Sequence, residues 1–223
     1  MITLYGAMAS RAPRVVWMLK ELGLPFQHVP TPFLDGSTRK AEFLAINPNG
    51  RVPALDDNGL LLCESLSINL YLAKRYGCSA PQTLGPASLL EDTLATQWSF
   101  WVLTEVEKPL LFASANRKLF APDQRDEEQA QMAVAKLKRP LKVLDAHLAQ
   151  RVQLLGERFT VADLNVATVM DLAPQCGISL AAWPHVQAWH QRCLARPAAA
   201  DWKDVSFSIP RPPTALGLLQ MFV

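Results

Sequence analysis

The chain has 223 residues, of which 50% are hydrophobic and 19% are charged, and its formal net charge is +2. This length and composition fit a globular protein of one large or two small domains with a sizeable core, rather than a disordered chain. A charge so near zero, without a dense stripe of Lys and Arg, argues against nucleic acid as a partner. No run approaches the roughly 20 apolar residues that span a bilayer, so we expect no membrane partner either.

The N-terminus, "MITLYG", reads directly as a strand, with no basic region followed by a signal-type apolar segment. We therefore expect the protein to be cytoplasmic. The four cysteines, Cys63, Cys78, Cys176 and Cys193, form no C-x-x-C pair and fit small buried side chains in a reducing compartment. The histidines lack metal-ligand spacing, so we predict no metal site.

Residues 1–77 alternate between strand-like and helix-like patterns. The predicted elements are a strand at 2–5, a helix at 12–24 that stops at Gly23, a strand at 26–30, a short helix at 37–46 with a Ser or Thr cap, two strands around the turn 56–59, and a helix at 65–77. This order predicts an α/β domain that contains a four-stranded mixed sheet with helices on both faces.

The remainder of the chain is helical in character after an irregular stretch at 78–87, which is rich in Pro and Gly and which we assign as a linker. The predicted helices are a long one at 88–114 with a bend near Pro109, a second at 125–150 with a kink at Pro140, and shorter ones at 160–177 and 183–197. Thr160 and Asp163 are expected to form a capping box. The tail at 206–223 has too many prolines for a helix. We therefore predict an all-helical domain with an irregular tail over residues 88–223.

Pro53 stands where the first strand of the predicted hairpin begins. Since proline has no N–H, it is tolerated at the first residue of a strand but not inside the hydrogen-bonded ladder. A cis Val52–Pro53 bond would turn the amide and carbonyl of Val52 outward, where they could pair with an extended peptide. The alternative is a trans proline that only begins the strand, and cis bonds are the rarer form.

Two further sites combine polar groups with the start of a predicted helix. Glu64 and Ser65 stand at the start of the helix at 65–77, where backbone N–H groups and the helix dipole favour an anion. The pair would suit an α-amino acid end group, with Glu64 accepting from the ammonium and Ser65 holding the carboxylate. Ser10, in the loop after the first strand, could donate a hydrogen bond to a sulfur anion. Ordinary helix capping is the alternative for both sites.

Taken together, these motifs resemble those of the cytosolic glutathione transferases. The resemblance rests on "LYG…S…RV" at the start, "FLAINPNGRVPAL" followed by "LCES…I…YL", and "FTVADLNVA". The loop serine is similar to that of the serine-type, phi- and theta-like branches. The resemblance covers the chain in order as far as residue 197 and implies a thioredoxin-like N-terminal domain at 1–77 and an all-helical C-terminal domain after the linker.

The resemblance also implies roles for the residues singled out above. Val52 would hold the cysteine backbone of glutathione by two main-chain hydrogen bonds, with Pro53 cis. Glu64 and Ser65 would bind the γ-glutamyl end. Ser10 would stabilise the thiolate of glutathione and would be the catalytic residue.

Beside these residues, the chain follows the family pattern less closely. Lys40 matches a position that contacts the glycine carboxylate, but Thr38 stands where phi-type proteins often have histidine. Arg51 is also expected at the glutathione site, although this position is often occupied by glutamine. Ala9 precedes the loop serine, so the cysteine that some bacterial relatives use there is absent.

The activity implied is glutathione transfer of the kind used in detoxification, with glutathione as co-substrate and a hydrophobic electrophile as acceptor. Met8, Phe33 and Trp101 are the expected lining of an acceptor pocket between the domains, and core packing is the alternative for the aromatic residues near Trp101. A homodimer is expected from the family. Two other functions stay open: a glutathione-dependent peroxidase or disulfide reductase, and a non-catalytic glutathione-binding carrier or interaction protein.

Overall fold

A four-stranded mixed sheet in the order β2–β1–β3–β4 forms the core of the N-terminal domain. Its strands are β1 (Ile2–Tyr5), β2 (Phe26–Val29), β3 (Ala54–Asp57) and β4 (Leu60–Cys63). β1 runs parallel to β2 and antiparallel to β3, and β3 runs antiparallel to β4. The structure is a computed structural model, which describes residues 1–78 and 83–202. The predicted tail at 206–223 and part of the predicted linker lie outside the described residues.

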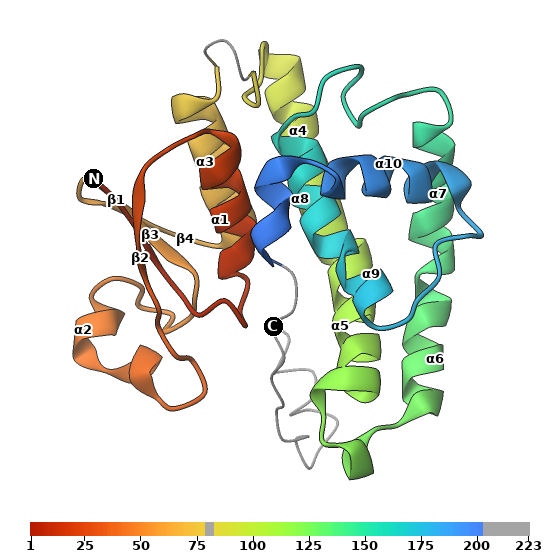
Figure 1. Cartoon of the computed structure of the whole chain (residues 1–223), viewed down its shortest axis with the longest axis horizontal. Coiled ribbons are helices and arrows are strands. Elements are labelled where there is room, and N and C mark those ends of the chain that lie inside the picture. Colours follow the sequence, from red (N-terminus) through yellow and green to blue (C-terminus); the bar gives the residue numbers. More distant parts are fainter. Residues whose placement is uncertain (79–82, 203–223) are drawn as a thin grey trace.

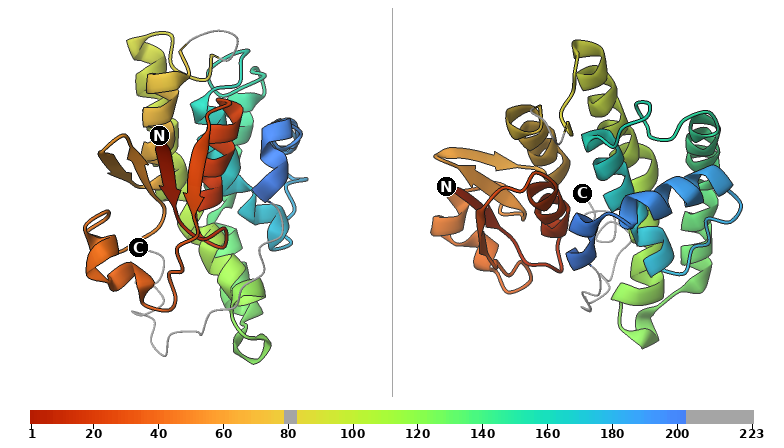
Figure 2. Two further views of the ribbon diagram at one scale, coloured as in Figure 1. Left: turned by 60° about the vertical axis from the view of Figure 1, so that its left-hand side comes forward. Right: turned by 45° about the horizontal axis from the view of Figure 1, so that its top comes forward.

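Three helices accompany the sheet: α1 (Ala12–Glu21), α2 (Ala41–Leu44) and α3 (Ser65–Tyr76). α1 and α3 lie between the sheet and the helical half of the chain, whereas α2 lies away from that half (Figures 1 and 2). Every residue of α1 except Lys20 is buried. A helix buried on all sides needs partners on all sides, and α1 has the sheet on one side and the helical domain on the other.

The turn of the β3–β4 hairpin is tighter than predicted. Asp56 and Asp57 belong to β3, and Asn58 and Gly59 alone make the reversal. Their φ values of 53° and 95° suit a two-residue hairpin turn, for which Asn-Gly is the favoured sequence.

The single helix predicted at 37–46 is in fact two short pieces. Lys40 is extended, with φ −72° and ψ 150°, and it separates the 3-10 turn η1 (Ser37–Arg39) from α2. No Ser or Thr caps α2, since Lys40 itself is the N-cap residue. The interruption leaves the Lys40 side chain exposed.

The second half of the described chain is all-helical. Its elements are α4 (Leu89–Trp101), the π-helical η2 (Val102–Glu107), α5 (Lys108–Ser114), the π-helical η3 (Ala115–Leu119), the 3-10 turn η4 (Pro122–Gln124), α6 (Glu127–Lys136), α7 (Lys138–Leu148), α8 (Val161–Met170), α9 (Leu172–Gln175), α10 (Pro184–Leu194) and the 3-10 segment η5 (Pro197–Trp202). The predicted fold class, an α/β domain followed by an all-α domain, is thus confirmed. The domain boundaries stay a prediction.

Prolines account for the interruptions of the predicted long helices, because proline lacks the N–H that bonds the carbonyl four residues earlier and its ring crowds that carbonyl. Pro109 follows a π-helical segment rather than a simple bend. Pro140 lies in the first turn of α7, and the chain breaks at Leu137 instead of kinking, so one predicted helix becomes α6 and α7. Pro174 similarly follows a break at Asp171, between α8 and α9.

The predicted capping box at the start of α8 is confirmed by the reciprocal bonds of Thr160 and Asp163. The Asp163 carboxylate also accepts from Leu154 N at 2.7 Å and from Trp189 Nε1 at 3.0 Å. Burial raises the pKa of Asp163 despite these donors. All residues of α8 are buried, so this box fixes the helix at the centre of the helical domain.

A charged cluster joins the start of α1 to η2 in the second domain. The Glu107 carboxylate accepts from Arg11 Nε at 2.9 Å and from Arg14 Nη2 at 2.6 Å. Burial by itself raises the pKa of Glu107, but the charges of Arg14 and Arg11 outweigh it and lower the pKa to about 2. Burial lowers the pKa of Arg14, yet a guanidinium stays protonated at neutral pH. The buried pair is therefore fully ionised.

A chain of buried amide groups crosses the same interface. Asn69 of α3 donates to the Arg14 carbonyl at 3.3 Å and to Asn165 Oδ1 of α8 at 2.9 Å. Asn165 in turn donates to Ser99 Oγ of α4 at 2.9 Å. Hydrogen bonds in a low-dielectric interior are strong and directional, so this chain fixes α1 and α3 against the helical domain.

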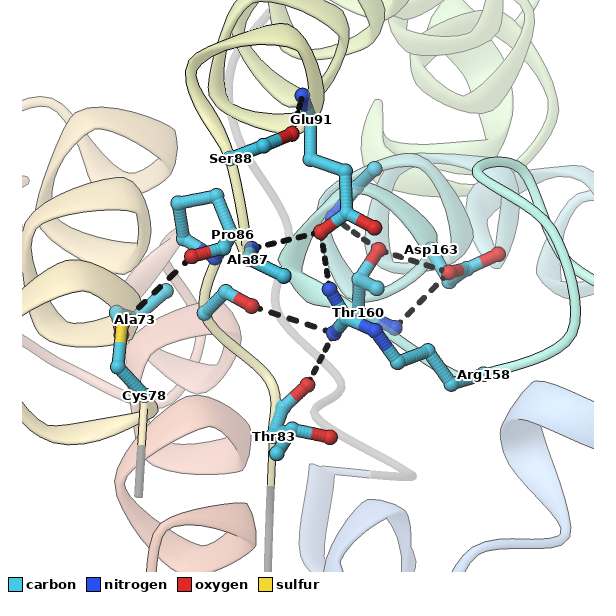
Figure 3. Close-up of polar contacts among 12 residues, drawn as sticks. Ala73, Cys78, Thr83, Pro86, Ala87, Ser88, Glu91, Arg158, Thr160 and Asp163 are labelled. Atoms are coloured by element: carbon cyan, nitrogen blue, oxygen red, sulfur yellow. Dashed lines mark hydrogen bonds and ion pairs between the residues drawn. The ribbon is translucent and has the colours of Figure 1, made fainter. Parts of the chain in front are cut away.

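Arg158 ties the end of the linker to the helical domain (Figure 3). Its guanidinium donates to the carbonyls of Thr83 and Gly85 and to the Glu91 carboxylate. Glu91 also accepts from Ala87 N at 2.7 Å. One side chain thus connects the linker, α4 and the loop before α8.

Gly6 lies at a crowded point directly after β1. A Cβ at this position would lie 2.8 Å from the Cβ of Ala12 and 3.4 Å from the Cβ of Val52. The carbonyl oxygen of Gly6 lies 2.7 Å from Nε2 of His28 in β2. The loop after β1 therefore approaches α1 and Val52 more closely than a side chain would allow.

We predict that Gly6→Ala lowers the free energy of unfolding by about 2 kcal/mol, through overpacking and backbone strain. Urea denaturation measures the change. Gly36→Ala is the matched control, because Gly36 has a positive φ of 83° but nothing within 4 Å of an added Cβ. Its loss should be smaller, about 1 kcal/mol. Equal losses in the two variants would contradict the crowding at Gly6.

We also predict that Glu107→Gln lowers the free energy of unfolding at neutral pH by about 3 kcal/mol, because two guanidinium groups lose their buried counter-charge. The pKa of Glu107 falls from 4.5 to about 2 on folding, so its contribution is present above pH 4.5 and is lost as the pH falls toward 2.

Urea unfolding of wild type and variant should therefore give free energies that converge between pH 4.5 and pH 2. Glu105→Gln, at an exposed position of the same segment, is the control and should change little. If the difference in free energy of unfolding between wild type and Glu107→Gln stayed the same at the acid end of this range, the ionised carboxylate would not be the cause of that difference.

Candidate functional site

The strand register brings three segments together at one end of the sheet. Tyr5 pairs with Ala54, and Ala54 pairs with Cys63, so the ends of β1 and β4 and the start of β3 form one row. The segments attached to this row are the loop that carries Ser10, the dipeptide Val52–Pro53 and the dipeptide Glu64–Ser65. These are the sites that the sequence singles out, and they come from three distant parts of the first domain.

The Val52–Pro53 peptide bond is cis, so the rarer of the two sequence-based alternatives is confirmed. Pro53 is buried directly before β3, and Val52 is half-buried. The side chain of Asn47 holds the preceding loop, since it donates to the Arg51 carbonyl at 2.7 Å and accepts from Asn49 N at 3.1 Å. Sequence reasoning missed Asn47, although an Asn that bonds the backbone two residues on is a known turn signal.

Glu64 has an unusual backbone conformation for a residue other than glycine, with φ 66° and ψ 106°. Such conformations cost about 1–3 kcal/mol and persist where the surrounding structure imposes them, often at binding sites. The Glu64 side chain is exposed, and its carbonyl accepts from Ile68 N at 2.9 Å. Ser65 is the first residue of α3 and is 5% exposed. Capping of α3 by the Ser65 side chain is therefore wrong, because Glu64 is the N-cap residue.

The start of α3 is suited to a zwitterion. The first N–H groups of a helix have no partner within the helix, and together with the helix dipole they favour an anionic oxygen. The exposed Glu64 carboxylate offers an acceptor for an ammonium group in the same place. An amino acid end group carries both charges on one carbon, so it matches this pair of opposite charges.

The Ser10 hydroxyl is engaged within its own loop. It donates to the Ala7 carbonyl at 2.6 Å and accepts from Ala12 N at 3.0 Å. Ordinary N-capping by Ser10 is nevertheless wrong, because Arg11 is the N-cap residue of α1 and Ser10 precedes it. The Ser10 hydroxyl makes only local side-chain-to-backbone bonds. To donate to a sulfur atom, the hydroxyl must turn its proton away from Ala7, while its bond from Ala12 can remain.

Lys40 and Arg51 are both exposed, whereas Thr38, two residues before Lys40, is buried. The loop closes over Thr38 at Gly50, where an added Cβ would lie 2.8 Å from the Thr38 carbonyl oxygen. Gly50 has a positive φ of 60°, so both its backbone conformation and its surroundings call for glycine. The contacts of Lys40 and Arg51 with a ligand stay predictions.

The residues predicted to line an acceptor pocket lie in different surroundings. Met8 is half-buried and packs against the hydrophobic core, and Phe33 is half-buried. Trp101 packs edge-on against Trp98, with 5.0 Å between ring centroids, and Trp98 lies 4.7 Å from the ring of His147 in α7. Trp101 thus belongs to an aromatic cluster of the helical domain, as the core-packing alternative describes, and the pocket itself stays a prediction.

The cysteines are all free thiols. Cys176 and Cys193 are buried as predicted, and burial raises the pKa of both. Cys63 is half-buried and Cys78 is exposed, so the prediction of burial was wrong for Cys78. Among residues 1–78 and 83–202, no group of three or more His, Cys, Asp or Glu side chains is arranged to hold a metal ion. In the same two stretches, no helix has both the length and the apolar character needed to cross a bilayer.

Family models and curated relatives match both halves of the chain. The N-terminal and C-terminal domain models of glutathione S-transferase match residues 1–74 and 104–197. Glutathione S-transferase 3 of Zea mays is 36% identical over 225 residues, which cover 95% of this chain and 96% of the relative. Glutathione S-transferase GstB of Escherichia coli (strain K12) is 31% identical over 201 residues, covering 89% of this chain and 95% of the relative.

Solved structures share the architecture. Glutathione transferase F7 from Populus trichocarpa aligns with a TM-score of 0.80 and 26% identity, over 91% of this chain and 97% of the other. Glutathione S-transferase-I bound with lactoylglutathione aligns with a TM-score of 0.80 and 29% identity, over 90% and 97%. Sequence and structure therefore agree that this chain belongs to the glutathione S-transferase family.

Proposed function

We propose that this glutathione transferase binds glutathione where the three segments meet and activates its thiol for attack on a hydrophobic electrophile. The observation that carries the proposal is the row Tyr5–Ala54–Cys63, from which all three segments leave. Structures of glutathione S-transferase-I with lactoylglutathione and of Ure2p with glutathione support glutathione as the ligand.

In this proposal, the tripeptide lies along the end of the sheet. The backbone of Val52 pairs with the cysteine residue of glutathione in the manner of an added strand. Glu64 and Ser65, at the start of α3, bind the γ-glutamyl end. Lys40 and Arg51 supply positive charge toward the glycine carboxylate.

The proposed role of Ser10 is to stabilise the thiolate of bound glutathione. A free thiol has a pKa of about 8.5, so only a few per cent is ionised at neutral pH. Lowering this pKa by about two units corresponds to roughly 2.7 kcal/mol. A hydrogen bond to a charged acceptor contributes roughly 1.5–3 kcal/mol, so a Ser10 hydroxyl turned away from Ala7 is sufficient for most of the shift.

We predict that Ser10→Ala binds glutathione nearly as tightly as wild type but turns over 1-chloro-2,4-dinitrobenzene about 10- to 100-fold more slowly, because the hydrogen bond to the thiolate is lost. Calorimetry gives the affinity, and ultraviolet titration of the bound thiolate gives its pKa, which should rise by about one to two units.

Ser179→Ala is the matched control for this variant. The Ser179 hydroxyl also accepts from a local backbone N–H, that of Ala181 at 3.2 Å, but it lies between α9 and α10 in the helical domain. This variant should keep both turnover and thiol pKa. If Ser10→Ala also left both unchanged, Ser10 would have no part in the chemistry.

We further propose that the protein is a homodimer, with a cytoplasmic location that cell fractionation would test. Large apolar side chains exposed on α4 and on the edge strand β4 support the dimer. On α4, Leu89, Leu90 and Phe100 are 81%, 68% and 64% exposed, and on β4 Leu60 and Leu61 are 45% and 42% exposed.

We predict that sedimentation equilibrium finds twice the chain mass of 24.7 kDa. Replacing both Leu89 and Phe100 with Asp should shift the protein toward the monomer, because two charges would be buried at the interface. Met132→Asp, at a 57% exposed position on α6, is the control and should leave the dimer intact. A monomeric wild type would contradict the dimer.

A further inference from the structure

A pocket of about 300 Å³ opens on the helical domain between the end of α7 and one face of α10. Its lining residues are Leu148, Arg151, Val152, His185, Ala188 and Arg192. α7 and the adjoining end of α10 lie on the side of the helical domain away from the sheet (Figure 1). The pocket is therefore distinct from the proposed glutathione site, with which it shares no residue.

The pocket combines an apolar floor with a cationic rim. Leu148, Val152 and Ala188 are its apolar members, whereas two arginines and a histidine supply the polar groups. Residues 185, 188 and 192 are spaced by three and four positions, so they share one face of α10. None of the six lining side chains is acidic.

Both arginines are held in place by the backbone rather than by carboxylates. Arg151 Nη1 donates to the His147 carbonyl at 3.1 Å, and Arg192 Nη2 donates to the Val152 carbonyl at 2.9 Å. Within the described residues, neither arginine forms an ion pair. A guanidinium carries five N–H donors, so each of the two still has donors and a full positive charge to offer.

The acidic residue at this end of α10, Asp145, forms no ion pair with Arg151 or Arg192 among the described residues. Asp145 of α7 accepts through Oδ1 from the backbone N–H groups of His185 at 2.9 Å and Val186 at 3.1 Å. It therefore caps the start of α10. The positive charge of Arg151 and Arg192 remains without a counter-ion among the described residues.

We propose that this pocket binds a small organic anion in which a carboxylate or phosphate group is carried on a short apolar body. The planar donor pairs of Arg151 and Arg192 match the oxygens of either group. Leu148 and Ala188 contact the apolar body, and the volume of about 300 Å³ is at the lower end for small-molecule pockets. The proposal does not depend on the chemistry at Ser10.

Calorimetric titration with three probes tests the proposal: 4-phenylbutyrate, phenyl phosphate and the neutral 4-phenylbutanamide. Both anions should bind with a Kd of about 1 mM or tighter, and the amide should bind at least tenfold more weakly. The tighter of the two anions identifies which group the pocket prefers. No anion binding at about 20 mM, or equal binding of the amide, would overturn the proposal.

Variants assign the binding to this pocket. Arg151→Gln combined with Arg192→Gln should raise the Kd of the anions at least tenfold, while transferase turnover stays unchanged. Ala188→Glu, which places a carboxylate on the floor but keeps both arginines, should have the same effect. Arg139→Gln removes an exposed arginine of α7 outside the pocket and should keep the wild-type Kd. Wild-type anion affinity in the double variant or in Ala188→Glu would overturn the proposal.

Discussion

The pairing of Tyr5 with Ala54 and of Ala54 with Cys63 is the constraint on which the rest of the N-terminal domain depends. A shift of one residue in either pairing would turn every side chain of a strand to the opposite face and would move the attached segments apart. With this register, the Ser10 loop, the cis Val52–Pro53 bond and the start of α3, which are far apart in sequence, all adjoin one end of the sheet. Gly6 permits the close approach, because it leaves room for Ala12 and Val52.

The second domain contributes to this site through α1. That helix is buried on both sides, and its first turn is bonded to Glu107 and, through the Arg14 carbonyl, to Asn69. The Ser10 loop leads directly into the same turn, so its position depends on packing against the helical domain. The C-terminal half of the chain therefore helps to position the Ser10 loop.

Periodicity and turn residues were sufficient to predict the order of strands and helices, because each element carries its own apolar pattern. They did not predict how a helix responds to proline: Pro140 accompanies a break three residues earlier instead of the expected kink. The positive φ of Glu64 and the contact of Arg14 with Glu107 were also invisible, since neither a strained backbone nor a long-range ion pair has a local sequence signal. Residue patterns alone left Val52–Pro53 open between cis and trans, and only the resemblance to the family implied cis.

Titration of ¹⁵N-labelled protein with glutathione, followed by the amide resonances, tests most directly whether one peptide occupies all three segments. The amide signals of Ser10, Val52 and Ser65 should shift together with a single Kd, whereas that of Arg192 should not move. If these three signals shifted with different Kd values, or if any of them stayed fixed at saturation, the three segments would not form one binding site.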